Sequence, residues 1–151
     1  MVLRELGLRD EAEIFAVIRT AFAVAPWNDD WHSAEEFHAY FLDILGNRNS
    51  LWLGLWEGEA LVALALGRLK HWFDGVEYCI DDFCVRPDCQ GRGAGSALLG
   101  QIREYACREG FKQVSLFTNR TAPAYAFYQK NGFAEVENRV CMALPCAPER
   151  A

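Results

Sequence analysis

Hydrophobic positions follow a helical period in two segments of the N-terminal third of the chain. The first segment begins after Asp10, a residue type that often caps helices, and its apolar stripe spans residues 14–22. The second opens with Ser33 and Glu36, whose spacing has the form of a capping box, and it ends at residues 46–47. The pattern therefore predicts two amphipathic helices, joined by a loop that contains both acids and tryptophans.

Further along the chain, short apolar runs bounded by turn residues predict strands, and two more segments have a helical period. The strands are expected at 2–5, 51–56, 61–69, 77–85, 114–117, 133–136 and 140–144, and the helices at 96–109 and 122–130. The second and third strands form a hairpin around the turn at 57–59, and the last two strands form a terminal hairpin. This order describes a mixed α/β sheet in a single domain of residues 1–151, with a core over 2–144 and a loose tail over 145–151.

The composition is that of a folded protein with an acidic balance of charge. Of 151 residues, 52% are hydrophobic, and 15 Lys+Arg against 21 Asp+Glu give a formal charge of −6. An acidic chain argues against nucleic-acid binding and mildly favours a cationic substrate over an anionic one. No apolar run approaches the ~18 residues of a membrane span, and the N-terminus lacks the apolar region of a signal peptide. The six cysteines show no C-x-x-C spacing and the three histidines are scattered, so we expect reduced thiols, no metal and a cytoplasmic protein.

A glycine-rich turn stands between the strand at 77–85 and the helix that follows it. The strand is ended by Arg86-Pro87-Asp88, since proline cannot donate to a ladder, and residues 90–95 then read Q-G-R-G-A-G. Glycines let the backbone approach a ligand closely, and the first turn of a helix presents free N–H groups. The expected guest is a phosphate or diphosphate. A P-loop is excluded because no lysine follows the glycines, and a Rossmann loop is excluded by their spacing.

Two signatures connect this turn with a known family. The run Gln90-x-x-Gly93-x-Gly95 resembles the acetyl-CoA pyrophosphate loop of the GNAT N-acetyltransferases, and residues 124–133, A-Y-A-F-Y-Q-K-N-G-F, resemble a second GNAT signature. The resemblance spans about residues 2–144 and is strongest over 81–133. It implies a central, antiparallel-rich sheet with a splayed pair of parallel strands and helices on both faces. It also implies acetyl-CoA as the acetyl donor, and a homodimer as an assembly that is common among relatives.

The resemblance places acetyl-CoA along two stretches of main chain. The strand near 83–85 would pair with the pantetheine arm, where one N–H could bind the thioester oxygen, and the glycine loop would hold the pyrophosphate. The family often has an asparagine seven residues before its tyrosine; this chain has Thr121 there, so Asn119 or Thr121 is expected to meet the cofactor instead. The expected cofactor-binding residues are Phe83, Cys84, Val85, Gln90, Gly91, Arg92, Gly93, Ala94, Gly95, Ser96, Asn119 and Thr121.

The tyrosine of the second signature, Tyr128, is the expected general acid of acetyl transfer. A phenol with a pKa of ~10 suits this role, because the alkyl thiolate that leaves acetyl-CoA is a base of comparable strength. The alternative is a core aromatic, because Tyr125 and Phe127 lie on the same short helix.

Asp81 and Asp82 stand in the middle of an otherwise apolar strand, where an unpaired carboxylate would be costly to bury. Strand alternation predicts opposite faces for the two side chains, with Asp81 on the face of Phe83 and Val85. The local sequence resembles the acidic strand of polyamine acetyltransferases. It is also similar to certain aminoglycoside acetyltransferases, which have a carboxylate at the same place. We assign Asp81 to binding or deprotonating the amine, directly or through water, and Asp82 to charge pairing with the substrate. The alternative is a salt bridge to a structural Arg or Lys.

Four residues of the loop after the first helix are candidates for the mouth of the acceptor site: Trp27, Asp29, Asp30 and Trp31. In the resembled family this loop overhangs the acceptor, and indoles with carboxylates suit a cation, so Trp27 and Trp31 are expected to bind substrate. The alternative is that the tryptophans only fix the loop to the core.

A covalent route through Cys84 or Cys79 is rejected. The adjacent acids would raise the thiol pKa, and cysteines in such strands usually pack in the core.

The sequence therefore predicts an acetyl-CoA-dependent N-acetyltransferase that transfers the acetyl group by direct attack of a primary amine on a small cationic molecule, of polyamine or aminoglycoside type. Two alternatives stay open. Acetylation of a protein N-terminus or lysine would need an open peptide groove. A non-catalytic acyl-CoA sensor would bind CoA without turnover, and the intact Tyr128 argues against it.

Overall fold

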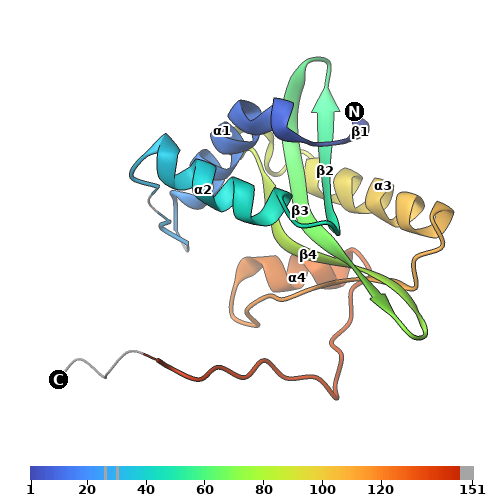
Figure 1. The fold of residues 1–151 in the computed structure, drawn as a ribbon. Helices are drawn as coiled ribbons and strands as arrows, with labels where there is room; N and C mark the ends of the chain where they lie inside the picture. Colours follow the sequence, from blue (N-terminus) through green and yellow to red (C-terminus); the bar gives the residue numbers. More distant parts are fainter. Residues whose placement is uncertain (26, 30, 147–151) are drawn as a thin grey trace.

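A computed structural model of the chain describes residues 1–25, 27–29 and 31–146. Its strands are β1 (Val2–Glu5), β2 (Ser50–Glu57), β3 (Ala60–Trp72), β4 (Gly75–Val85) and β5 (Gln113–Leu116). Its helices are α1 (Glu11–Phe22), α2 (Ala34–Leu45), α3 (Ala94–Arg108) and α4 (Pro123–Lys130), with 3₁₀ turns η1 (Leu8–Asp10) and η2 (Pro87–Cys89) (Figure 1). No helix of the described ranges is long and apolar enough to cross a membrane.

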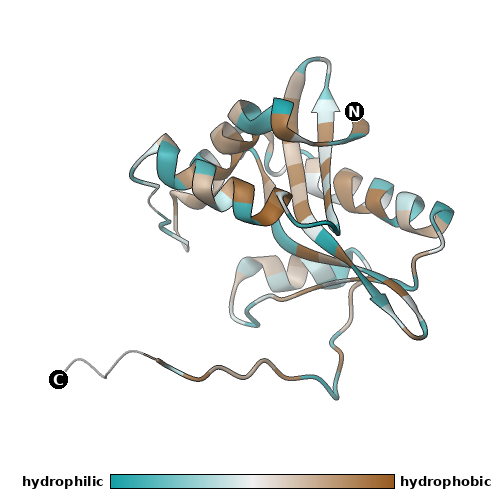
Figure 2. Ribbon diagram, in the orientation of Figure 1, coloured by the Kyte–Doolittle hydropathy of each residue, from teal (hydrophilic) through white to brown (hydrophobic). Residues whose placement is uncertain are grey.

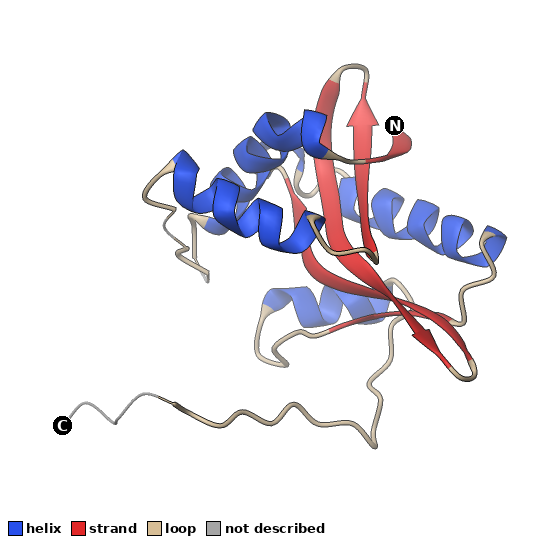
Figure 3. Cartoon of the chain, in the orientation of Figure 1, coloured by secondary structure: helices blue, strands red, loops and turns tan. Residues whose placement is uncertain are grey.

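The strands form one sheet in the order β1-β2-β3-β4-β5. Three of its four strand pairs are antiparallel, and β4 with β5 is parallel (Figure 3). The tight turn predicted at 57–59 joins β2 and β3, with Gly58 at a positive φ of 60°. The predicted mixed sheet with a parallel pair is confirmed.

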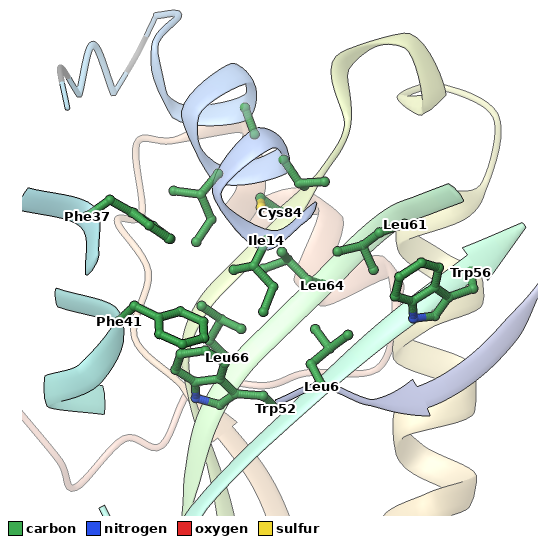
Figure 4. Close-up of a cluster of buried hydrophobic side chains, with 13 residues drawn as sticks. Leu6, Ile14, Phe37, Phe41, Trp52, Trp56, Leu61, Leu64, Leu66 and Cys84 are labelled. Atoms are coloured by element: carbon green, nitrogen blue, oxygen red, sulfur yellow. The ribbon is translucent and has the colours of Figure 1, made fainter. Parts of the chain in front are cut away.

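Helices cover both faces of the sheet, as expected. On one face, α1 and α2 bury a cluster that includes Ile14, Phe37, Phe41 and Trp52 (Figure 4). On the other face, α3 packs Leu98 and Ile102 against a second cluster from β2, β3 and β4. Brown and teal segments both occur along the helices in Figure 2, as expected of amphipathic helices on a sheet. Full burial of such side chains contributes ~1.5–3 kcal/mol each, which fixes the sheet between its two helical layers.

The predicted caps differ in their geometry. Ser33 Oγ accepts a hydrogen bond from the Glu36 N–H at 3.1 Å and so starts α2 as expected. Asp10 directly precedes α1, but its side chain accepts from the Gly7 N–H at 2.8 Å and caps η1 instead. Both contacts fix the entry of the chain into the first helical layer.

The predicted terminal hairpin is wrong. Residues 133–146 form no strand, and a hydrogen bond of 3.0 Å from the Arg139 N–H to the Val136 carbonyl closes only a local turn. A hairpin needs an apolar layer to pack against, and an isolated one is marginal in water. Val140, Met142 and Leu144 lack such a layer, because they are 80%, 88% and 87% exposed. The described part of the predicted tail, residues 145–146, is likewise outside helices and strands.

Candidate active site

The parallel strands β4 and β5 separate within the sheet. Their pairing ends at Ile80 and Leu116, whereas residues 82–85 continue to pair with β3 on the other side. The edge of β4 that faces β5 is therefore open over residues 81–85. This opening is the splayed pair that the sequence predicted, and it leaves main-chain groups near Phe83–Val85 available to an extended ligand.

The glycine loop leads from this opening to the N-terminus of α3. Gly91 and Gly93 have φ values of 70° and 85°, a left-handed conformation that favours glycine. Gly93 is the N-cap residue of α3, and no side chain caps this helix end. The N–H groups of its first turn and the positive end of its dipole are thus free for an anion, which fits a phosphate group.

A close contact makes a third glycine necessary. A Cβ added at Gly95 would lie 3.0 Å from Cζ of Phe127 and 3.3 Å from Cγ2 of Val85. The absence of a side chain thus lets α3 approach both β4 and α4. The glycines of the loop serve different purposes, two by backbone conformation and one by packing.

The remaining residues predicted to bind the cofactor surround this loop. The side-chain nitrogen of Gln90 donates to the Val85 carbonyl at 3.0 Å and ties the loop to the end of β4. Arg92 and Ser96 are exposed, and Ala94 is buried under the loop. Asn119 Oδ1 accepts hydrogen bonds from the Thr121 N–H and hydroxyl at 2.9 and 2.8 Å, so these two residues form a turn before α4.

Tyr128 lies on α4, next to the open edge of β4. Its ring centroid is 5.9 Å from Phe83, 5.3 Å from Phe127 and 5.6 Å from Phe133. Burial raises the pKa of Tyr128 to about 12, and the nearby Cys84 thiol adds to the shift. Its hydroxyl has no hydrogen-bond partner within the described part of the chain. A half-buried, protonated phenol beside the strand opening can donate a proton there.

The predicted opposite orientation of Asp81 and Asp82 is wrong. The register between β3 and β4 shifts by one residue here: Asp82 pairs with Leu66 and Ile80 with Gly67, which leaves Asp81 as an extra residue. This β-bulge interrupts the alternation that the prediction assumed. Both carboxylates line the same cavity of about 320 Å³ as a result.

The two carboxylates have different partners in this cavity. Asp81 forms a salt bridge with Arg68, as the alternative reading of the sequence expected, at 2.7 and 2.8 Å from Nη1 to its two oxygens. Asp82 accepts a hydrogen bond from the Tyr40 hydroxyl of α2. Burial raises the pKa of Asp82 above the usual range of a carboxyl; the Tyr40 hydrogen bond opposes this shift, and the charges of Asp81 and Asp29 add to it.

Cys84 follows Asp82 by two residues on β4. Its side chain is buried in the core cluster under α1 and α2. Burial, followed by the charge of Asp82, raises the pKa of the Cys84 thiol well above its usual range. A thiolate is therefore disfavoured, which agrees with the rejection of a covalent cysteine route.

Of the two predicted tryptophans in the loop between α1 and α2, Trp31 packs against the core cluster and contacts Tyr40, a lining residue of the cavity. Trp31 packs on Tyr40 with ring centroids 5.1 Å apart, whereas Trp27 lies edge-on to Phe22 and is 45% exposed. Asp30, predicted at the same mouth, lies outside the described residues. The charge of Asp29 adds to the raised pKa of Asp82.

Four lining residues of the cavity were not predicted as site residues: Tyr40, Ile44, Asn47 and Arg68. Tyr40 looked like a core position of an amphipathic helix, and Arg68 looked like an ordinary polar residue of a strand. The charge pattern offered one signal for Arg68: an arginine and an aspartate on consecutive strands of a hairpin.

Comparison with known proteins identifies the family. The model of the acetyltransferase (GNAT) family matches residues 12–133. The chain belongs to the GNAT family.

Two curated GNAT relatives are similar in sequence. The uncharacterized N-acetyltransferase YhfO of Bacillus subtilis is 27% identical over 83% of this chain and 92% of its own length. An uncharacterized N-acetyltransferase of Methanocaldococcus jannaschii is 35% identical over 44% of this chain, and the match spans only 32% of that protein. The prediction of a GNAT-type acetyltransferase is thus confirmed.

Solved structures share the GNAT fold with this chain over nearly its full length. An aminoglycoside acetyltransferase from a soil metagenome, in complex with sisomicin, matches with a TM-score of 0.74 at 16% identity, over 97% of this chain and 96% of that one. A ribosomal-protein-alanine N-acetyltransferase from Brucella melitensis matches with a TM-score of 0.75 at 18% identity, over 95% and 100%. A transcriptional regulator from Bacillus halodurans matches with a TM-score of 0.75 at 19% identity, over 95% and 99%. Identities this low show a shared fold alone.

Proposed function

We propose that this GNAT protein is an acetyl-CoA-dependent N-acetyltransferase that acetylates a primary amine of a small cationic molecule, of polyamine or aminoglycoside type. One observation carries the proposal. The open edge of β4 runs from an acidic cavity at Asp82, past Tyr128, to the uncapped N-terminus of α3. A candidate amine site on β4, a candidate proton donor on α4 and a candidate anion site before α3 thus lie around the open part of one strand.

Acetyl-CoA, the donor used by this family, would supply an activated acetyl thioester and a pyrophosphate handle. The loop at Gly91–Gly95 suits the pyrophosphate, because its left-handed glycines and the first turn of α3 present main-chain N–H groups to an anion. The open edge at Phe83–Val85 suits the amide groups of the pantetheine arm, which can pair with it as an added strand. An N–H group of the same edge is available to the carbonyl oxygen of the thioester.

Tyr128 is the proposed general acid. During transfer, a carbon–nitrogen bond forms, the carbon–sulfur bond breaks, and the departing sulfur takes the phenolic proton. The pKa of about 12 keeps Tyr128 protonated at neutral pH, so the donor is available in every molecule. The nitrogen loses two protons over one turnover. The one lost after the attack restores the phenol, and the one lost before the attack leaves to solvent as the net proton of the reaction.

The amine must lose a proton before it attacks, and the two carboxylates of the bulge suit that step unequally. Asp82 is half-buried, and its raised pKa makes it the better proton acceptor. Asp81, which the sequence assigned to this role, already forms a salt bridge with Arg68, so its oxygens are engaged. We propose that Asp82 receives the proton, directly or through water. The role of Asp81 as proton acceptor stays a prediction, which the acetylation rate of the Asp81→Asn variant tests.

The test is a panel of amines with acetyl-CoA, followed by the release of free CoA. The panel contains monoamines, diamines, a polyamine, an aminoglycoside, a peptide with a free N-terminal alanine and a lysine peptide. We expect turnover of small cationic amines and stabilisation of the protein by CoA of about 2.7 kcal/mol at 100 times the Kd. Turnover of the peptides alone would assign the protein-acetyltransferase alternative. Stabilisation by CoA without turnover of any amine would assign the sensor.

A further inference from the structure

The cavity beside Asp82 holds one cation among its lining residues. Arg68 and Asp81 form a salt bridge at this cavity, with side chains 52% and 28% exposed, so the pair lies at its solvent side. A guanidinium keeps its charge at every physiological pH. The charge of Asp81 is therefore balanced within the protein itself.

Asp82 has no such balance. It accepts from the neutral Tyr40 hydroxyl, and among the described residues no Lys or Arg pairs with it. The lining of the cavity thus has two carboxylates and one guanidinium, and one negative charge remains for a ligand. That charge lies at the buried end.

The rest of the lining suits the uncharged part of an amine. Ile44 and the Tyr40 ring supply apolar surface. The Asn47 side-chain nitrogen donates to the carbonyls of Asp43 and Ile44 at 2.8 and 3.2 Å, which leaves its oxygen as an acceptor for an N–H group. A volume of about 320 Å³ holds a compact group and not a whole oligosaccharide.

We propose that Arg68 determines charge selectivity, so that the cavity accepts one ammonium, at Asp82, and disfavours acceptors that bring a second ammonium next to the guanidinium. This inference rests on the proposed function and narrows its substrate class to amines that place a single ammonium in this cavity, with any further ammonium outside it. Arg68 follows Leu66, the partner of Asp82, by two strand residues, a separation of about 7 Å along β3. A second ammonium a few carbon atoms from the first therefore finds only a carboxylate, Asp81, whose charge Arg68 already balances.

The experiment compares 1-aminobutane with 1,4-diaminobutane, which differ in charge and share a four-carbon chain. For each amine, kcat/KM is measured from CoA release at saturating acetyl-CoA, on the wild type and on Arg68→Gln, Arg68→Lys and the double variant Arg68→Gln/Asp81→Asn. Thermal unfolding of each protein, with and without CoA, verifies folding and donor binding.

The wild type should prefer the monoamine. Arg68→Gln removes the cation and releases Asp81, so the diamine-to-monoamine ratio of kcat/KM should rise about ten-fold or more. Arg68→Lys keeps the charge and should keep the ratio within about three-fold of the wild type. The double variant returns the cavity to one free carboxylate and should restore the wild-type ratio, an outcome that a merely structural role for Arg68 does not produce.

A ratio that is the same in all four proteins, with turnover intact, would overturn the charge-selectivity inference and leave the proposed function standing. If the protein is folded and binds CoA but acetylates neither of these two amines nor any other amine of the panel, the proposed function is overturned, and the inference with it.

Discussion

The hydroxyl of Tyr40 on α2 donates a hydrogen bond to the carboxylate of Asp82 on β4, 42 residues later in the chain. This contact joins the helical layer to the acidic cavity at the point where β4 bulges. It offsets part of the cost of burying Asp82, because a carboxylate that accepts a hydrogen bond is stabilised in its charged form. Tyr40 is thus a positioning residue for Asp82.

Replacement of this phenol should reduce stability. In Tyr40→Phe the carboxylate of Asp82 loses its partner, and we expect the free energy of unfolding to fall by about 1–3 kcal/mol, measured by urea denaturation. Tyr125→Phe is the control, since its hydroxyl bonds the exposed Glu135 and its loss should stay within about 0.5 kcal/mol. Because the pKa of Asp82 rises further without Tyr40, the acid limb of kcat/KM should also move to higher pH. An unchanged acid limb with reduced stability would separate Tyr40 from Asp82 function.

The titration of Asp82 should appear in the pH dependence of stability. Burial raises its pKa, so the folded state binds the proton more tightly than the unfolded state. Its contribution is fully present below the ordinary aspartate pKa of about 3.9 and is lost as pH rises through the raised value. The difference in unfolding free energy between the wild type and Asp82→Asn should therefore decrease with pH over this window.

A variant of Glu135 should show the opposite dependence of stability on pH. The hydrogen bonds from Arg120 and Tyr125 lower the pKa of Glu135 to about 2, so its contribution is present above the ordinary glutamate pKa and is lost as pH falls. The same difference for Glu135→Gln should therefore increase with pH. If the difference in unfolding free energy changed with pH in the same way for both variants, the change seen with Asp82→Asn would reflect a pH effect on the whole protein and not the titration of Asp82.

The features that the sequence predicted well are local. The strand before Pro87, the glycine run and the helix after it depend on neighbouring residues, and the loop geometry at Gly91 and Gly93 follows from the same short segment. The side-chain directions of Asp81 and Asp82 instead depend on the register between two strands, which local alternation does not contain.

The missed residues depend on tertiary contacts. Arg68 and Tyr40 reach the acidic strand from β3 and from α2, and neither contact follows from a motif. The terminal hairpin failed for a related reason. Alternating apolar residues favour a strand, but a strand forms only against a partner, and residues 133–146 do not pair with β5.

Replacing each of the two glycines of α3 by alanine should change stability in opposite directions. Gly95→Ala would press a methyl group against Phe127 and Val85, and overpacking of this kind costs about 1–3 kcal/mol. Gly100→Ala meets no atom within 4 Å and should stabilise the protein by about 0.5–1 kcal/mol, because alanine favours a helix. Both are measured by urea unfolding. The KM for acetyl-CoA should rise in Gly95→Ala alone, since the displaced α3 holds the anion loop; equal KM values would separate that loop from donor binding.

Tyr128 and Tyr125, three residues apart on α4, test the proposed proton donor. Tyr128→Phe keeps the ring contacts with Phe83 and Phe127 but removes the hydroxyl, so kcat should fall about 10²- to 10⁴-fold while CoA still stabilises the protein against heat. Tyr125→Phe removes an exposed hydroxyl that bonds Glu135 and should leave kcat within about two-fold. The rate of the wild type should show no loss from this group until the pH approaches its pKa of about 12. A Tyr128→Phe enzyme as fast as the wild type would return Tyr128 to the role of a core aromatic, and the proton would then have to come from solvent.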